Sequence, residues 1–170
     1  IMPGHAILTP LLMVLIMITG EFRGMSLTTD NVRPSPAPNA WQIGNLTIAG
    51  VVMGLGELVF CVAILAFGDY RLRFGLDALQ TLAFIVIVFG NQATTYTNRE
   101  RRHLWSSRPS IWLLLSSIAD LLIASTLAVG GIAITPLPVW VVASTLAAAA
   151  AFALLFDFVK VPVFRRLRIT

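Results

Sequence analysis

Long, nearly uninterrupted apolar runs are the feature that most restricts what this chain can fold into. A helix that crosses a bilayer needs roughly 20 mostly apolar residues, because the hydrocarbon core is about 30 Å thick. Four runs meet this requirement directly: Leu46 to Phe67, Ala78 to Tyr96, Ile111 to Ile134, and Val139 to Val159. Runs of this length predict transmembrane helices, in which every backbone group bonds within its own segment.

A fifth apolar segment lies near the start of the sequence. Residues 6–18 are apolar but too few to cross a bilayer, so a spanning helix must continue through Glu21 to about Leu27. Pro10 falls in the first turns of this segment, where a missing backbone donor costs least. The sequence therefore predicts an all-α integral membrane bundle of about five transmembrane helices, with a carboxylate in the first.

The composition excludes an ordinary soluble domain. Hydrophobic residues make up 57% of the chain and charged residues only 12%, whereas soluble domains carry about 25% charged residues. Cys61 is the single cysteine, so no disulfide within the chain is possible. The two histidines, His5 and His103, are far apart in the sequence, and no metal site is predicted.

The distribution of basic residues predicts the orientation. Cytoplasmic loops of membrane proteins carry an excess of Lys and Arg. With five spans, ten of the twelve basic residues fall on the side of the C-terminus: Arg23, Arg33, Arg99, Arg101, Arg102, Arg108, Lys160, Arg165, Arg166 and Arg168. We therefore expect a plasma- or inner-membrane protein with a cytoplasmic C-terminus, whose partner is the lipid bilayer and not nucleic acid.

The chain divides into four parts on this reading. These are a first membrane helix (1–28), a Pro-rich cytoplasmic loop (29–45), four further helices (46–159) and a basic cytoplasmic tail (160–170). The alternating prolines Pro34, Pro36 and Pro38 favour a stiff, extended loop, because proline fixes φ and removes backbone donors. A rigid connector without further function is the simplest interpretation.

Three carboxylates lie inside the apolar runs: Glu21, Glu57 and Asp120. A charged carboxylate at mid-membrane costs about 2.5 kcal/mol or more. No Lys or Arg lies within 46–67 or 111–134. The carboxylates must therefore be protonated, face a wet cavity or pair with another helix, and groups of this kind carry protons or cations in transporters.

Structural roles are the alternative for each of these acids. Glu57 is a candidate to hydrogen-bond in its protonated form to Asn91 or Gln92 on the next helix. Asp77 and Asp157 lie near helix ends, where we expect them to be solvated.

The segment Asp30-Asn31-Val32-Arg33-Pro34-Ser35-Pro36-Ala37-Pro38-Asn39-Ala40-Trp41 resembles a segment of the plasma-membrane proton-pumping subgroup of the P-type ATPases. That family has Asp, any residue, Val, a basic residue, Pro-Ser-Pro, any residue, Pro, two residues and Trp in the cytoplasmic loop after the sixth of ten membrane helices. A second match joins Gln92 to Arg99, Arg101 and Arg108-Pro109. The resemblance covers nearly the whole chain, as the sixth to tenth helices.

The resemblance implies an ATP-driven cation pump with a phosphorylated aspartate intermediate. Glu21 falls where proton pumps carry a membrane aspartate between Asn and Gly, but this chain reads Gly20-Glu21-Phe22, so only the carboxylate is kept. Glu21 is thus the first ion-binding candidate, and Glu57, Asp120 and Gln92 are further ones. The residues expected to contact the catalytic domains are Asp30, Arg33, Pro34, Pro36 and Pro38.

The catalytic parts of such a pump are missing from this sequence. The phosphorylation motif Asp-Lys-Thr-Gly-Thr is absent, and Lys160, the only lysine, does not stand in it. No catalytic residue, metal ligand or cofactor is therefore predicted here, and ATP and Mg²⁺ are expected only in the rest of the pump, with its other helices and cytoplasmic domains. A free-standing structural or partner-binding membrane fragment and a small autonomous ion carrier remain as alternatives.

Overall fold

The computed structural model describes residues 9–30, 43–99, 107–132 and 134–166, which form five α-helices. Their bounds are α1 Pro10–Leu27, α2 Ile43–Tyr70, α3 Leu76–Asn98, α4 Ile111–Gly130 and α5 Val139–Arg166. All five are long and apolar enough to cross a membrane, and the described residues contain no strand. The predicted five-helix, all-α membrane bundle is therefore confirmed.

Local sequence signals explain where several helices begin and end. Thr9 caps α1 by accepting a hydrogen bond from the backbone of Leu12, and Pro10 occupies the first helical position, which needs no donor. Ser110 caps α4 in the same way. Gly131 ends α4 with a φ of 66°, a left-handed conformation that glycine adopts without the strain of a Cβ.

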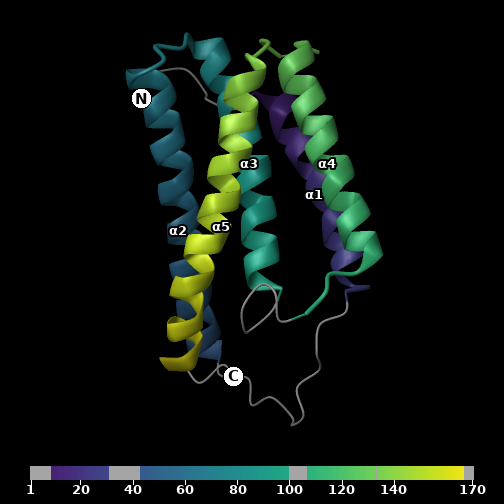
Figure 1. Ribbon diagram of the computed structural model, residues 1–170, viewed down its shortest axis with the longest axis vertical. Helices are drawn as coiled ribbons and strands as arrows, with labels where there is room; N and C mark the ends of the chain where they lie inside the picture. Colours follow the sequence, from purple (N-terminus) through teal and green to yellow (C-terminus); the bar gives the residue numbers. More distant parts are fainter. Residues whose placement is uncertain (1–8, 31–42, 100–106, 133, 167–170) are drawn as a thin grey trace.

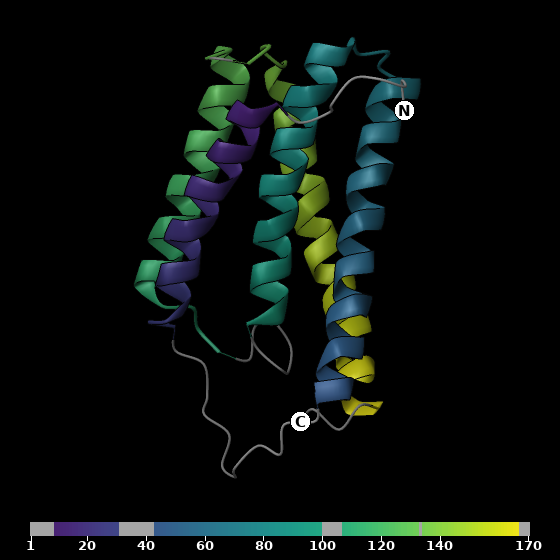
Figure 2. The ribbon, with the colours of Figure 1, turned by 180° about the vertical axis from the view of Figure 1, so that it is seen from behind.

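The helices are arranged around α3. Both views show α1 and α4 together on one side of α3 and α2 and α5 together on the other (Figures 1 and 2), and α3 packs against all four. The short connections after α2 and α4 lie at one end, which we call the hairpin end. We call the opposite end, where α3 finishes and α4 begins, the basic end, because Arg99 and Arg108 lie there.

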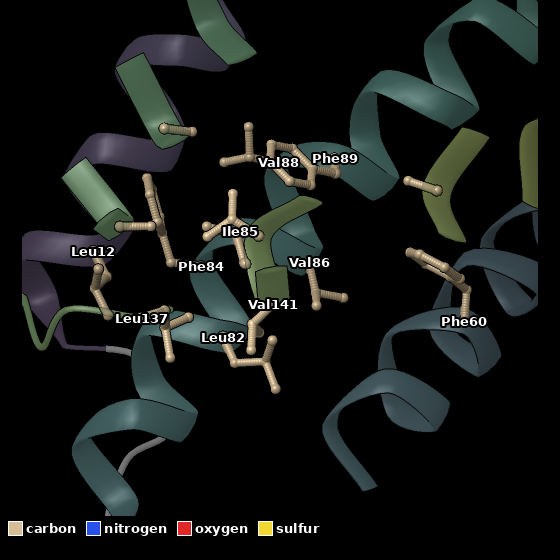
Figure 3. Close-up of a cluster of buried hydrophobic side chains, with 14 residues drawn as sticks. Leu12, Phe60, Leu82, Phe84, Ile85, Val86, Val88, Phe89, Leu137 and Val141 are labelled. Carbon is tan, nitrogen blue, oxygen red and sulfur yellow. The ribbon is translucent and has the colours of Figure 1, made fainter. Parts of the chain in front are cut away.

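The central position of α3 gives it most of the hydrophobic core. Its buried side chains extend to both sides, towards Leu12 and Leu137 in one direction and Phe60 in the other (Figure 3). Of the residues in its candidate span, 61% are buried inside the bundle, compared with 12% in α1. The helix that is most enclosed is therefore also the least hydrophobic surface for lipid, since it has little lipid to meet.

Two helix bounds bear on the functional residues. α1 continues without interruption through Glu21 to Leu27, as the length of a membrane span requires. α5 continues past Val159 to Arg166 and contains Pro162. Lys160, which the sequence places in the tail, is consequently part of a membrane-spanning helix.

Candidate ion-binding carboxylates and the polar seam

Glu21 lies on the outward face of α1. The face turned to the bundle carries Leu12, Thr19 and Ser26, seven residues apart, and Ser26 Oγ lies 2.7 Å from Ser116 Oγ of α4. At 3.6 residues per turn, Glu21 points about 180° away from Leu12. Its exposed side chain is surrounded by large apolar side chains that are themselves exposed: Met17, Ile18, Phe22 and Met25.

Glu57 faces α3 from the other side of the bundle. Its side chain is half-buried, and a methyl group placed on Gly90 would lie 3.6 Å from Glu57 Oε1. The expected hydrogen bond between Glu57 and Gln92 does not form, because the amide of Gln92 bonds to α4 instead. Glu57 therefore stands at the α2–α3 interface, against a stretch of α3 that has no side chain to fill the space.

Asp120 is buried between α4 and α3, where it meets Gln92. The Gln92 amide nitrogen donates a hydrogen bond to Asp120 Oδ2 at 2.9 Å and a longer one to the carbonyl oxygen of Ser117 at 3.3 Å. Asp120 is 4% exposed and Gln92 6% exposed. Two of the sequence candidates are thus brought together, and the carboxyl group is held by a neutral amide rather than by a cation in this contact.

Polar contacts continue from Asp120 towards the basic end. The Tyr96 hydroxyl donates to Ser117 Oγ at 3.0 Å, one turn from the Gln92–Asp120 contact. Gln92, Tyr96 and Arg99 share one face of α3, and they lie opposite polar side chains on one face of α4. We call this row the polar seam; its members are Gln92, Tyr96 and Arg99 on α3 with Ser110, Ser117 and Asp120 on α4.

Asp30 closes the seam at the basic end. Its Oδ2 lies 3.1 Å from Arg99 Nε in an ion pair whose side chains are at most 2% exposed, and its Oδ1 accepts the Ser110 N–H at 2.8 Å. Arg99 also donates from Nη2 to the carbonyl and hydroxyl oxygens of Ser107. The carboxylate sits at the N-terminus of α4, where the helix dipole favours negative charge, and it ties the end of α1 to both α3 and α4.

The other loop candidates fall outside the described residues: Arg33, Pro34, Pro36 and Pro38. Of the five residues expected to contact catalytic domains, Asp30 is the one that the structure places. Its carboxylate is already occupied by contacts within the bundle.

A second buried ion pair joins α5 to the end of α3. Lys160 Nζ lies 2.8 Å from Asp157 Oδ1 and donates to the carbonyl oxygen of Thr97 at 2.7 Å, and both charged side chains are fully buried. The expectation that Asp157 is solvated is therefore wrong, because the pair and the helix-end carbonyl replace the water that it would need. Asp77 is exposed, as predicted.

The three carboxylates of the apolar runs do not form a single site. Glu21 faces outward from α1, Glu57 faces α3 from α2, and Asp120 faces α3 from α4. In the described residues, no group of three or more His, Cys, Asp or Glu side chains gathers in a way that could hold a metal ion. Any ion-binding role must therefore be assigned to each carboxylate separately.

The sequence contained signals for the contacts that we did not predict. Tyr96 follows Gln92 by four residues and Asp120 follows Ser117 by three, which places each pair on one helix face. Lys160 follows Asp157 by three residues in the same way. This spacing identifies a shared face, although it does not identify the neighbouring helix that the face meets.

No protein-family model matches the sequence. The likeness to proton-pumping ATPases thus rests on the residues quoted for the 30–41 segment and for the stretch from Gln92 to Pro109.

Proposed function

We propose that this chain is the transmembrane module of an ATP-driven cation pump related to the P-type ATPases, with the proton as its expected cargo. In this proposal Glu21 is the carboxylate that binds the transported cation. The observation that carries the proposal is the position of Glu21 at the centre of the exposed, apolar face of α1.

A carboxylate on a lipid-facing surface is expensive. Facing the hydrocarbon costs about 2.5 kcal/mol or more, and a further membrane helix over this face removes that contact with lipid. Methyl groups placed on Gly20 or Gly24, on either side of Glu21, would meet nothing within 4 Å. Small residues at this spacing let a second helix approach closely. The face is thus suited to become a helix–helix interface with a carboxylate inside it.

The remaining parts of the pump would supply the energy. They would carry the phosphorylated aspartate and bind ATP and Mg²⁺, because this sequence has no motif for either task. The C-terminus would be cytoplasmic in a plasma or inner membrane, so that the loop 29–45 faces the catalytic domains. Phosphorylation in those domains would then drive alternating access to Glu21 through the helices that cover α1.

Glu21→Gln in the assembled pump tests the assignment. We expect ATP-driven proton transport into vesicles to be lost while the polypeptide still assembles, because the amide keeps the shape of the side chain but cannot ionise. Asp69→Asn is the matched control, since it also removes one carboxylate, at an exposed position near the end of α2. Coupled transport at the wild-type rate in Glu21→Gln would refute the proposed site.

Two simpler measurements separate the pump from its alternatives. An antibody against the C-terminal residues reports the mass of the native polypeptide and the proteins that purify with it, to be compared with 18.4 kDa for this chain. A partner or longer polypeptide with a phosphorylation domain would support the pump. Proton flux in liposomes that contain this chain alone would favour a small autonomous carrier instead.

A further inference from the structure

The polar seam is open to hydrogen-bonding groups in one direction and closed in the other. From Asp120 to Ser110 it extends over ten residues of α4, or about 15 Å at 1.5 Å per residue. Along this distance Gln92, Tyr96 and Ser117 provide amide and hydroxyl groups, and the basic end follows with Arg99.

On the hairpin side of Asp120 the same two helix faces are apolar. Ala124 and Ala128 continue the α4 face, and Val88 and Ile85 continue the α3 face, none of them more than 2% exposed. A proton moves along hydroxyl groups and water but not through close-packed hydrocarbon, so these four side chains form a barrier. The carboxyl group of Asp120 therefore has hydrogen-bonding neighbours on one side only.

The surroundings of Asp120 favour proton uptake over cation binding. On α3 it faces the neutral Gln92, and then Tyr96 and the paired Arg99 further along. The other charged groups on the packed helices are Asp30 and the Lys160–Asp157 pair, both at the basic end, while Glu21 points outward and Glu57 lies on the opposite flank of α3. A cation would need several oxygen ligands, whereas a proton needs one.

We propose that Asp120 is a proton-binding site, separate from Glu21, that exchanges its proton with the basic end of the bundle along the polar seam. In this step the carboxylate takes one proton from a hydronium ion, forms an O–H bond and leaves a water molecule. The hydroxyl groups of Tyr96 and Ser117 each accept and donate a hydrogen bond, so they relay the proton together with water.

Space for this exchange lies beside the seam. A cavity of about 440 Å³ between α3, α4 and α5 is bordered by Gln92, Tyr96 and Ser117. Figure 1 shows α4 and α5 separating from their connection towards the basic end, which leaves this flank of α3 uncovered. The side chains of the seam can therefore change rotamer without a movement of the helices.

Infrared difference spectroscopy tests the site. The full chain, with the partners that purify with it, is placed in lipid nanodiscs and the pH is changed. We expect the carbonyl band of a protonated carboxylic acid to appear and disappear with pH, to vanish in Asp120→Asn and to shift in Asp120→Glu. The band should persist in Glu21→Gln and Glu57→Gln. A band lost in either of those variants, or one that never changes with pH, would overturn the proposal.

The route of exchange is tested on transfer to heavy water. Tyr96→Phe and Ser117→Ala should slow the deuterium shift of the Asp120 band by about tenfold, which corresponds to about 1.4 kcal/mol in the barrier. Thr81→Val is the matched control, because it removes a buried hydroxyl from α3 on the hairpin side. Slower exchange in Thr81→Val, or an unchanged rate in the two seam variants, would refute access from the basic end.

The outcome is independent of the transport role of Glu21. Transport that survives Glu21→Gln would remove the proposed cation site and leave the Asp120 band untouched. Conversely, a missing Asp120 band would leave the pump assignment open to its own test.

Discussion

α3 and α1 cross the same bundle under opposite conditions. α3 is enclosed by four helices and its basic end is held by two buried ion pairs, one to Asp30 and one to the Lys160–Asp157 contact. α1 touches α3 and α4 along one narrow face, and its remaining surface carries Glu21 among exposed apolar side chains. The polar groups of α3 are therefore satisfied within this chain, whereas the carboxylate of α1 depends on what covers it.

Lys160→Ala should have the largest effect on this difference. It leaves the Asp157 carboxylate buried without its cation and the Thr97 carbonyl without its donor. Removing one partner of a buried ion pair costs about 4 kcal/mol. Thermal unfolding in nanodiscs should show a large loss of stability, and Lys160→Met combined with Asp157→Asn should recover most of it. A single variant as stable as the wild type would mean that the pair does not hold α3 to α5.

Asp30→Asn should have an intermediate effect, because the amide oxygen can still accept the Ser110 N–H while the charge that pairs with Arg99 is lost. We expect a loss of about 2 kcal/mol, the scale of a hydrogen bond to a charged group. Asp69→Asn, at an exposed position, is the matched control and should change the unfolding temperature little. If both variants unfold alike, the ion pair contributes nothing to the connection between α1 and α3.

Gly20→Ala should have the smallest effect on the chain itself. A methyl group there meets nothing within 4 Å, so stability should stay the same or rise by about 0.5 kcal/mol. Gly56→Ala sharpens the contrast: its methyl group would overlap the ring of Phe156 on α5, and overpacking of this kind costs about 2 kcal/mol. Unfolding temperatures of the two variants check this order, and equal losses would contradict it.

The same Gly20→Ala variant bears on the partner helices. If the exposed face of α1 is an interface, co-purification of partner proteins should weaken although the chain remains stable. Undiminished co-purification would show that no helix approaches α1 closely at Gly20.

The number and limits of the membrane helices were predictable from the sequence because they depend on local properties. Span length required α1 to reach Leu27, and it does so. The direction in which each side chain points was not predictable in the same way, since a helix that is apolar on all sides has no polar face to orient it. Glu57 illustrates this: its position in the run was plain, but its neighbour proved to be Gly90 rather than Gln92.

Polar residues were harder to place than apolar ones. Asp157 lies near a helix end in the sequence, a position that usually means contact with water, yet Lys160 and the end of α3 enclose it completely. Asp120 and Gln92 were recognised as candidates, but their contact depends on the alignment of α3 with α4, which only the packed structure supplies. Separate contacts of this kind arise between elements distant in the sequence, where spacing within one helix gives no information.

The central position of α3 also has a consequence for biosynthesis. A membrane protein enters the bilayer in the order in which it is made, and helices associate after insertion. α1 and α2 pack mainly against helices that come later in the chain, and among the described residues they make no extensive contact with each other. The first two helices must therefore wait in the membrane until α3 emerges, and Glu21 spends this interval with the translocation machinery or lipid as its only neighbours.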